Sequence, residues 1–264
     1  MKMFVFDLDG TLLDSNRCMP SENMSYLNKL KNEGYKVVIA TGRTLLSAYS
    51  RLNGDIVNYI ISDTGAKIYD VDKKKFIYNN FISKKMLNNL LELYNNTILD
   101  FYVCSGGKYY KYSPLLNEDE NIYNDKQKFL SDIDEVDHMG IDFKNNEDVS
   151  KMYNYIVNNY EDLECFIMQD SFDNIRWLEI LPKGASKYNA ISMLANTLNI
   201  PNEEIMAFGD SLNDVDMLSN CGCGVAMANA LDTVKKAANY ITLKNNEELG
   251  VIQFLREYLD EKEK

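Results

Sequence analysis

The sequence predicts an α/β fold in which a core of parallel strands is interrupted by an inserted α+β module. Short apolar runs alternate with helical patterns over residues 1 to about 80, and this alternation resumes after residue 182. Between these parts, helices are grouped with adjacent strand-like runs. Strand–helix–strand alternation is typical of parallel sheets, whereas grouped helices and antiparallel strands are typical of α+β modules.

The core begins with an apolar strand, FVF at residues 4–6, which runs directly into DLDGT. Ligands of open α/β sheets bind at the carboxyl ends of the strands. Asp7 and Asp9 are two residues apart, so their side chains point the same way along an extended segment, and Gly10 permits a sharp turn. Such carboxylates suit Mg²⁺, and one can act as a nucleophile while the other moves a proton. A bare DxDG also fits a solvated turn, so the assignment depends on the rest of the chain.

The remaining core elements follow in order. A helix begins near Ser21 and ends near Gly34, and the runs KVVIA and VNYIIS predict buried strands at 36–40 and 57–62. After the insertion, Lys187 opens a helix, a strand is expected at 204–208 and another near 223–227, and a helix closes the chain.

The inserted module contains a predicted hairpin, in which SGGK joins the runs ILDFYVC and KYYKYS. The acidic segment 117–127 is expected to form a surface loop. A helix then precedes strands expected at 163–168 and 174–181.

Composition narrows the class of protein. The 264 residues carry a formal charge of −12, which disfavours a nucleic-acid partner, and the longest basic run, Lys73 to Lys75, is expected at a hairpin tip. Five scattered cysteines argue against a disulfide framework, and small buried packing residues are the favoured interpretation of Cys221 and Cys223. No apolar stretch reaches membrane-spanning length, so a cytoplasmic protein is expected.

Four groups of polar residues fall at the ends of core strands, and together they predict a phosphoryl-transfer site. Carboxylates can hold Mg²⁺, a hydroxyl and an ammonium can bind phosphate oxygens, and an aspartate can attack phosphorus. The chain has no GK[ST] loop of the P-loop NTPases. The groups are Asp7 with Asp9, Thr41, Lys187, and Asp210 with Asp214.

These motifs resemble those of the haloacid dehalogenase superfamily, in particular its Cof-like phosphatases of subclass IIB. The resemblance covers essentially the whole chain. The matching segments, in order, are DLDGTLLDS, ATGR at 40–43, PKGASK at 182–187, GDSLNDVDML at 209–218 and GVAMANA at 224–230.

The resemblance implies a Rossmann-like parallel-sheet core, residues 1–82 and 182–264, with an inserted α+β cap domain, residues 83–181, that closes over the site. It also implies that Asp7 is a nucleophile that becomes an aspartyl-phosphate, and that Asp9 is the general acid and base. Mg²⁺ would be held by Asp7, the backbone carbonyl of Asp9, Asp210 and, directly or through water, Asp214. Thr41 and Lys187 would bind the phosphoryl group, with Asn213 beside them.

Other residues stay open or depart from the family pattern. Arg43 could reach the substrate or the cap, or only hold its own loop, while Asp14, Asp63 and Asp216 are interpreted as helix caps or surface charges. Cof-like chains usually read NGA after the third strand, where this chain has Thr64-Gly65-Ala66, so a contact normally made by Asn is not carried over. Candidate specificity residues in the cap are Tyr109 to Tyr112, His138 and Arg176; cross-strand packing explains the tyrosines equally well.

The leading hypothesis is therefore a Mg²⁺-dependent phosphatase of small phosphomonoesters, such as sugar phosphates or phosphorylated cofactors. Its partner would be a small phosphorylated metabolite, and the protein would be a monomer or homodimer. The alternatives are a phosphomutase of a sugar phosphate and a catalytically silent metabolite-binding regulator.

Overall fold

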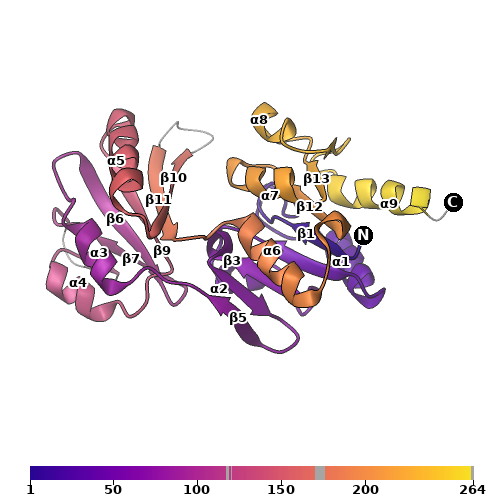
Figure 1. Ribbon diagram of the computed structural model, residues 1–264, viewed down its shortest axis with the longest axis horizontal. Coiled ribbons are helices and arrows are strands. Elements are labelled where there is room, and N and C mark those ends of the chain that lie inside the picture. Colours follow the sequence, from indigo (N-terminus) through magenta and orange to yellow (C-terminus); the bar gives the residue numbers. More distant parts are fainter. Residues whose placement is uncertain (117–118, 120, 170–175, 263–264) are drawn as a thin grey trace. The chain divides into compact units, whose positions relative to one another are not determined.

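A computed structural model describes residues 1–116, 119, 121–169 and 176–262. By its internal contacts the chain divides into two compact units. The first contains residues 1–79 and 186–264, and the second contains residues 80–185. Figure 1 labels most of their elements.

The first unit is built on an eight-stranded sheet in the order β14-β13-β12-β1-β2-β3-β4-β5. Six of these strands are parallel, and the hairpin β4–β5 adds two antiparallel strands at one edge. The strands are β1 Met3–Phe6, β2 Lys36–Ala40, β3 Tyr59–Ser62, β4 Lys67–Asp70, β5 Lys75–Asn79, β12 Ile205–Gly209, β13 Cys223–Ala226 and β14 Tyr240–Ile241.

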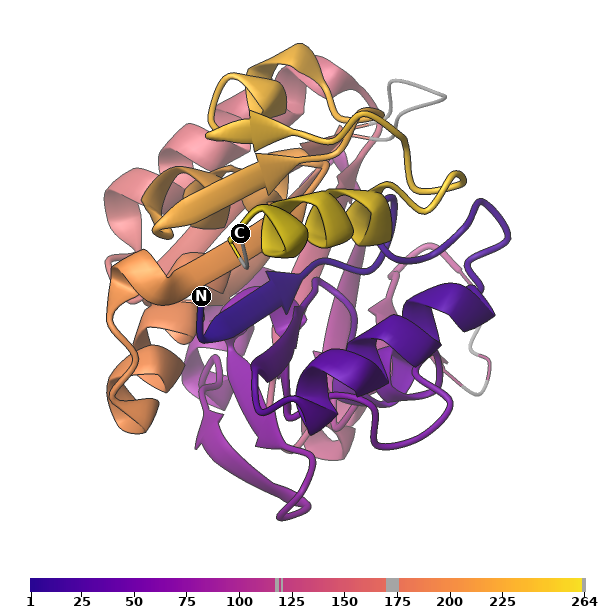
Figure 2. The same ribbon diagram turned by 90° about the vertical axis from the view of Figure 1, so that its right-hand side faces the viewer.

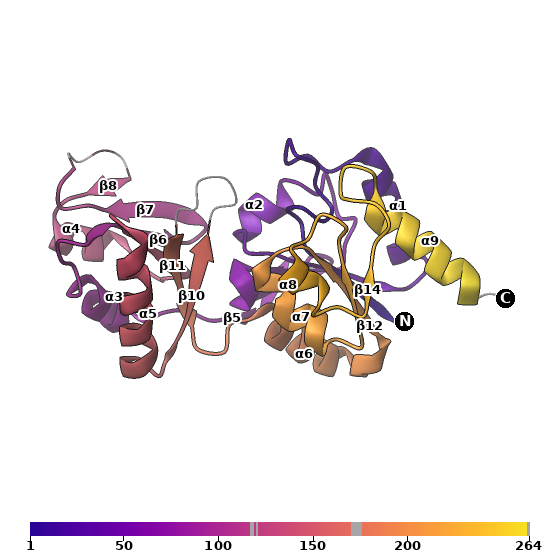
Figure 3. The same ribbon diagram turned by 90° about the horizontal axis from the view of Figure 1, so that it is seen from above.

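Helices cover both faces of this sheet, because the central strands are apolar on both sides. Phe4 and Phe6 of β1 pack with α1 and α9, whereas Met3 and Val5 face α6 and α7. Figures 2 and 3 show α1 beside α9 on one face and α6 beside α7 on the other. The helices are α1 Ser21–Asn32, α2 Leu45–Tyr49, α6 Lys187–Leu198, α7 Val215–Asn220, α8 Asp232–Lys235 and α9 Gly250–Lys262.

The second unit has a six-stranded sheet in the order β10-β11-β9-β6-β7-β8, antiparallel except between β7 and β8. Its apolar core includes Phe101, Phe129 and Leu178. The strands are β6 Ile98–Ser105, β7 Lys108–Tyr112, β8 Ile122–Tyr123, β9 His138–Phe143, β10 Leu163–Gln169 and β11 Arg176–Pro182. The helices are α3 Lys84–Leu91, α4 Lys126–Asp132 and α5 Asn146–Asn159.

The α/β fold class predicted from the sequence is confirmed. The hairpin between β6 and β7 turns at Gly106 and Gly107, which have φ values of 57° and 79°. One expectation was wrong: within 117–127, β8 pairs with β7, and α4 begins at Lys126 with Asp125 as its cap. Local acidity predicted solvent exposure there but carried no information about strand pairing. Residues 174–175 of the strand expected at 174–181 lie outside the described residues.

Three smaller features complete the fold. Cys221 and Cys223 are buried and form no disulfide bond, as the sequence indicated. Lys73 and Lys74 lie in the turn between β4 and β5. Among the helices of the described residues, none combines the length and the apolar character needed to cross a membrane.

The close approach of β13 to α7 makes a testable prediction. A methyl group on Gly224 would lie 2.0 Å from the Leu218 carbonyl oxygen, so backbone would have to move. We expect Gly224→Ala to lower the free energy of unfolding by about 3 kcal/mol, measured by urea denaturation followed by circular dichroism.

Gly34→Ala is the matched control. Gly34 has a φ of 93° with no neighbouring atom within 4 Å of an added methyl group, so it should lose only about 1 kcal/mol through backbone strain. Equal losses in the two variants would contradict the steric explanation.

Candidate active site

The predicted site residues of the core are placed by the carboxyl ends of parallel strands. The Asp7 N–H donates to the Phe208 carbonyl at 3.0 Å and so extends the pairing of β1 with β12. In the same way the Thr41 N–H donates to the Ile61 carbonyl at 2.9 Å, just beyond β2. After Asp7 the chain turns at once, and the Leu8 carbonyl accepts from the N–H groups of Thr11, Leu12 and Leu13. Strand pairing therefore fixes where Asp7 and Thr41 lie.

A fully buried ammonium group lies at the centre of the site. The Nζ atom of Lys187, the first residue of α6, lies 2.7 Å from Asp7 Oδ1 and 2.5 Å from Asp214 Oδ1. All three side chains are buried. An unpaired charge would be very unfavourable at this depth, so the lysine and the two carboxylates depend on one another.

Asp214 is itself held by the turn after β12. Its Oδ2 atom accepts from the N–H groups of Asp210 and Ser211 at 3.0 and 2.9 Å and from Ser211 Oγ at 3.2 Å. Both oxygens of Asp214 are thus engaged, one by Lys187 and the other by the turn. This carboxylate orients Lys187 and shapes the loop that carries Asp210.

Asp210 lies opposite the DLDGT turn. Thr11 Oγ1 donates to Asp210 Oδ1 at 3.1 Å. A methyl group on Gly10 would lie only 2.2 Å from Asp210 Oδ2, so a larger residue would displace the Asp210 carboxylate. Gly10 has a φ of 73°, which also favours glycine.

Burial and mutual repulsion disfavour the ionised forms of two carboxyl groups in the site, Asp7 and Asp210. Burial raises the pKa of Asp7 well above its ordinary value; Lys187 opposes this effect, and the charges of Asp214 and Asp210 reinforce it. Burial, followed by the charge of Asp214, raises the pKa of Asp210 to about 7. Burial alone would lower the pKa of Lys187, but Asp214 and Asp7 more than offset this and raise it. The site holds more negative charge than its one ammonium balances.

The donor set fits a divalent cation. One oxygen each of Asp7, Asp210 and Asp214 lie within 4.8 Å of one another. Opposite ligands of an octahedral Mg²⁺ are about 4.2 Å apart, since each bond is about 2.1 Å long, and this spacing is close to the range seen here, so the three carboxylates can hold one ion directly or through water. A bound dication would also favour the ionised carboxylates that burial disfavours.

Asp9 is set apart from this buried cluster. Its side chain is 47% exposed and forms a bidentate ion pair with Arg43, whose Nε and Nη2 atoms each lie 2.6 Å from a carboxylate oxygen. Arg43 Nη1 also donates to Ser47 Oγ at 3.0 Å. Arg43, whose role the sequence left open, therefore holds Asp9 at the exposed side of the site.

Thr41 and Asn213 border the segment that follows β2. Thr41 is buried, and its Oγ1 atom accepts from the Arg43 N–H at 3.2 Å. Ser211 Oγ donates to Asn213 Oδ1 at 2.6 Å, so the Nδ2 end of that amide is left for other contacts. A methyl group on Gly42 would lie 3.6 Å from Asn213 Nδ2, which places this amide beside the Thr41–Gly42 peptide.

The structure adds residues that sequence reasoning did not assign. Thr11 and Ser211 orient Asp210 and Asp214, and Asn229 Nδ2 donates to the Gly10 carbonyl at 2.8 Å. All three lie inside the motifs DLDGT, GDSLND and GVAMANA, and that was the available signal. Asp63 was misinterpreted: it is buried, accepts from Ser62 Oγ at 2.9 Å and lies in the turn after β3. The Nζ atom of Lys67, four residues further along the chain, lies 3.9 Å from Asp63 Oδ2 and balances its charge.

The second unit holds the candidate specificity residues. Tyr109 and His138 interact through the tyrosine hydroxyl and Nε2 at 3.2 Å. Tyr112 is buried against Phe101 and Phe129, so it belongs to the apolar core, and the packing interpretation holds for it. The Arg176 N–H donates to Asn146 Oδ1 at 3.1 Å.

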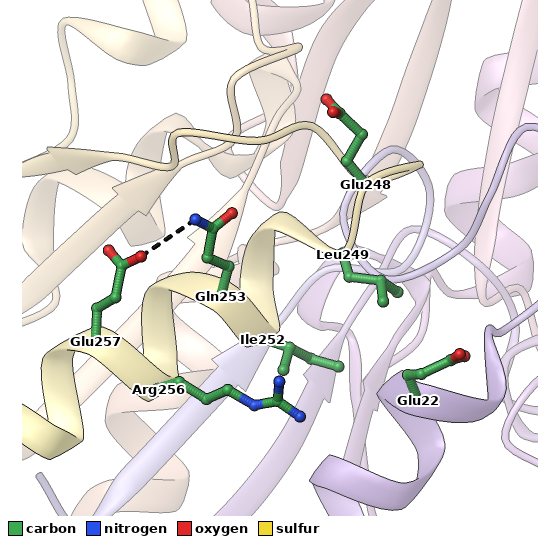
Figure 4. Close-up of a pocket in the computed structure, with 7 residues that line it drawn as sticks. All are labelled: Glu22, Glu248, Leu249, Ile252, Gln253, Arg256 and Glu257. Atoms are coloured by element: carbon green, nitrogen blue, oxygen red, sulfur yellow. Dashed lines mark hydrogen bonds between the residues drawn. The ribbon is translucent and has the colours of Figure 1, made fainter.

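A pocket of about 330 Å³ lies elsewhere in the first unit, between α1 and α9. Figure 4 shows Glu22, Glu248 and Glu257 around its rim, with Leu249 and Ile252 at its apolar side. Gln253 Nε2 donates to Glu257 Oε1 at 3.1 Å. Its lining residues include none of the predicted site residues, so it is separate from the candidate active site.

Known proteins resemble this chain in sequence and in fold. Residues 4–255 match the haloacid dehalogenase-like hydrolase family. A 5-amino-6-(5-phospho-D-ribitylamino)uracil phosphatase of Bacillus subtilis is 30% identical over 98% of this chain and 96% of its own length.

Two solved structures have the same fold. A haloacid dehalogenase-like hydrolase from B. subtilis, 27% identical, superposes with a TM-score of 0.80 over 97% of this chain and 99% of the other. A subclass IIB sugar phosphatase superposes with a TM-score of 0.75 over 98% and 99% of the two chains; at 22% identity this likeness concerns the fold alone. The chain therefore belongs to the haloacid dehalogenase-like hydrolases, in the Cof-like group, and is a phosphoric monoester hydrolase.

Proposed function

We propose that the protein is a Mg²⁺-dependent phosphatase that acts on small phosphomonoesters through a phosphorylated Asp7, in the cytoplasm. The observation that carries this proposal is the buried contact of Lys187 with Asp7 and Asp214, beside Asp210. A buried carboxylate held by a lysine at a strand end is positioned as a nucleophile, and the cationic lysine can also attract phosphate oxygens.

In the first step, an oxygen of Asp7 attacks phosphorus, and the bond between phosphorus and the substrate's alcohol oxygen breaks. The departing alkoxide takes a proton from the Asp9 carboxyl, which leaves Asp9 ionised. Lys187 and Thr41 stabilise the negative charge on the transferred group. The ion pair of Asp9 with Arg43 has to open for this step, because a carboxylate bound at both oxygens carries no proton to donate.

In the second step, Asp9 takes a proton from water, and the water oxygen attacks phosphorus. The bond between phosphorus and Asp7 breaks, inorganic phosphate leaves, and Asp9 again carries the proton. Asp7, Asp210 and the backbone carbonyl of Asp9 would hold Mg²⁺, with Asp214 linked through water because both of its oxygens are engaged. The ion, when bound, neutralises the phosphate charge and aligns it with Asp7.

Sugar phosphates and phosphorylated cofactors are the proposed substrate class. The Bacillus subtilis relative named for a phosphorylated ribitylamino-uracil supports a small polar phosphomonoester and adds that class of compound to the panel to be tested. Free phosphate as the product supports hydrolysis, an isomerised sugar phosphate would instead indicate a mutase, and ligand-induced stabilisation without turnover would indicate a silent regulator.

The first prediction concerns the nucleophile. We expect Mg²⁺-dependent phosphate release that stops with EDTA and falls by at least about a thousandfold in Asp7→Asn, because an amide cannot form the phosphoryl bond. Acid quenching after brief exposure to ³²P-labelled substrate should trap labelled wild-type protein and no labelled variant.

Asp14→Asn is the matched control, since Asp14 lies in the same segment and its partly exposed carboxylate accepts a hydrogen bond from the nearby Cys18 N–H at 2.8 Å. It should keep at least half of the activity. Labelling that persists in Asp7→Asn would exclude Asp7 as the phosphorylated residue.

The second prediction concerns the metal. Asp210→Asn removes a buried carboxylate that is disfavoured in the metal-free protein, so at pH 8 the melting temperature without metal should rise above that of wild type. The melting-temperature increase that Mg²⁺ produces in wild type should disappear in the variant.

The pH dependence supplies the control. The folded-state pKa of Asp210 is raised to about 7, so wild type loses stability relative to the variant as pH rises from about 4 to about 7, and the loss levels off above that range. The difference between the two metal-free proteins should therefore be much smaller at pH 4 than at pH 8. A variant that Mg²⁺ still stabilises as strongly as wild type would rule out Asp210 as a ligand.

A further inference from the structure

Thr64 has a backbone conformation that its residue type rarely adopts. Its φ and ψ are 52° and 32°, in the left-handed region, between Asp63 at φ 51° and Gly65 at φ 98°. A β-branched side chain is strained there, and such strain persists only where the surrounding structure imposes it.

Contacts on both sides hold this turn in place. The Thr64 N–H donates to the Thr41 carbonyl at 3.1 Å, and the Asp63 N–H donates to the Arg43 carbonyl at 2.9 Å. On the other side, a methyl group on Gly65 would lie 2.1 Å from the Ser186 carbonyl oxygen, at the start of α6. Thr64 is thus fixed between the residue after β2 and the helix that begins with Lys187.

The hydroxyl group of Thr64 is buried without a hydrogen-bond partner among the described residues. The residue is 5% exposed. A buried hydroxyl that makes no hydrogen bond lowers the stability of the fold, and so does a strained backbone. Thr64 combines both effects, and no contact of its hydroxyl within the described residues offsets them. This combination is typical of a group whose partner is a ligand.

The position of the Thr64 hydroxyl indicates which kind of ligand would accept its hydrogen bond. A methyl group on Gly42 would lie 3.4 Å from Thr64 Oγ1 and 3.6 Å from Asn213 Nδ2, so both atoms border the same small space beside Thr41. The hydroxyl can donate one hydrogen bond and the amide nitrogen two. Two neutral donors converge where Thr41 follows its strand, and phosphate oxygens accept such bonds.

We propose that the Thr64 hydroxyl is a further substrate-binding group that donates a hydrogen bond to a non-bridging oxygen of the phosphoryl group, beside Asn213 Nδ2. The proposal rests on the proposed phosphatase function, since it assumes that phosphate occupies this end of the site. It assigns a role to the residue at which this chain departs from the NGA pattern.

Thr64→Val tests the proposal, because valine keeps the shape and removes the hydroxyl. We expect the affinity of the Mg²⁺-loaded protein for inorganic phosphate, measured by isothermal titration calorimetry, to fall about tenfold, as for one lost hydrogen bond to a charged group. KM for 4-nitrophenyl phosphate should rise by a similar factor, with a smaller change in kcat. The melting temperature without ligand should stay equal or rise, because an unsatisfied hydroxyl is removed.

Thr64→Ser and Thr64→Gly form a second pair that does not depend on the folding of the valine variant. Both relieve the strain of the branched side chain, and glycine favours this backbone conformation. Serine should keep the phosphate affinity of wild type within about twofold, whereas glycine should lose about tenfold.

Thr242→Val is the matched control. Thr242 is also buried, but its hydroxyl accepts from the Ala228 N–H at 2.9 Å and donates to the Lys244 carbonyl at 2.6 Å. This variant should melt at a lower temperature and bind phosphate as wild type does.

Unchanged phosphate affinity in Thr64→Val, or equal affinities in the serine and glycine variants, would overturn the proposal, as would wild type that binds no phosphate. Wild type that binds inorganic phosphate but hydrolyses none of the phosphomonoesters would instead refute the proposed function alone. In that case the phosphate affinities of the variants still decide the role of Thr64.

Discussion

The contact of the buried Lys187 ammonium with Asp7 and Asp214 is the interaction on which the site depends. A charged group buried away from water is stable only when opposite charges and hydrogen bonds surround it. Here the two carboxylates that surround Lys187 come from residues 180 and 27 positions away in the sequence. Forming this contact requires β1, the turn after β12 and the start of α6 to meet at one edge of the sheet. Three features bring these segments together: the parallel strands, the turn at Gly10, and the hydrogen bonds from Ser211 that hold Asp214.

The same arrangement leaves the site with an excess of negative charge. Lys187 balances one carboxylate, while Asp7, Asp210 and Asp214 remain close together and partly or wholly buried. Burial therefore raises the pKa values of Asp7 and Asp210, which is unfavourable for the isolated fold at neutral pH. Thr64 adds backbone strain and a buried hydroxyl that has no hydrogen-bond partner within the described part of the chain. Unfavourable features of this kind concentrate at sites that bind ligands, because the ligand supplies what the folded chain lacks.

Much of this arrangement could be predicted from local patterns. Short apolar runs next to DLDGT and GDSLND predicted both the parallel strands and the groups at their ends, because strand burial and turn chemistry are local properties. Predictions failed where a long-range contact overrides the local pattern. The acidic segment around Ile122 forms a short strand because β7 offers an open edge. Asp63 is buried because the turn after β3 is held against the segment after β2, where the Asp63 N–H donates to the Arg43 carbonyl.

The sequence by itself determined the family, the positions of the core strands along the chain and the residue types that carry the chemistry, since motifs and hydrophobic periodicity are local features of the sequence. Only the tertiary structure decided which of those groups contact one another. It paired Arg43 with Asp9, engaged both oxygens of Asp214, and fixed Thr64 between Thr41 and the start of α6. These contacts join residues far apart in sequence, and their geometry follows from strand register and close packing, which no local pattern encodes.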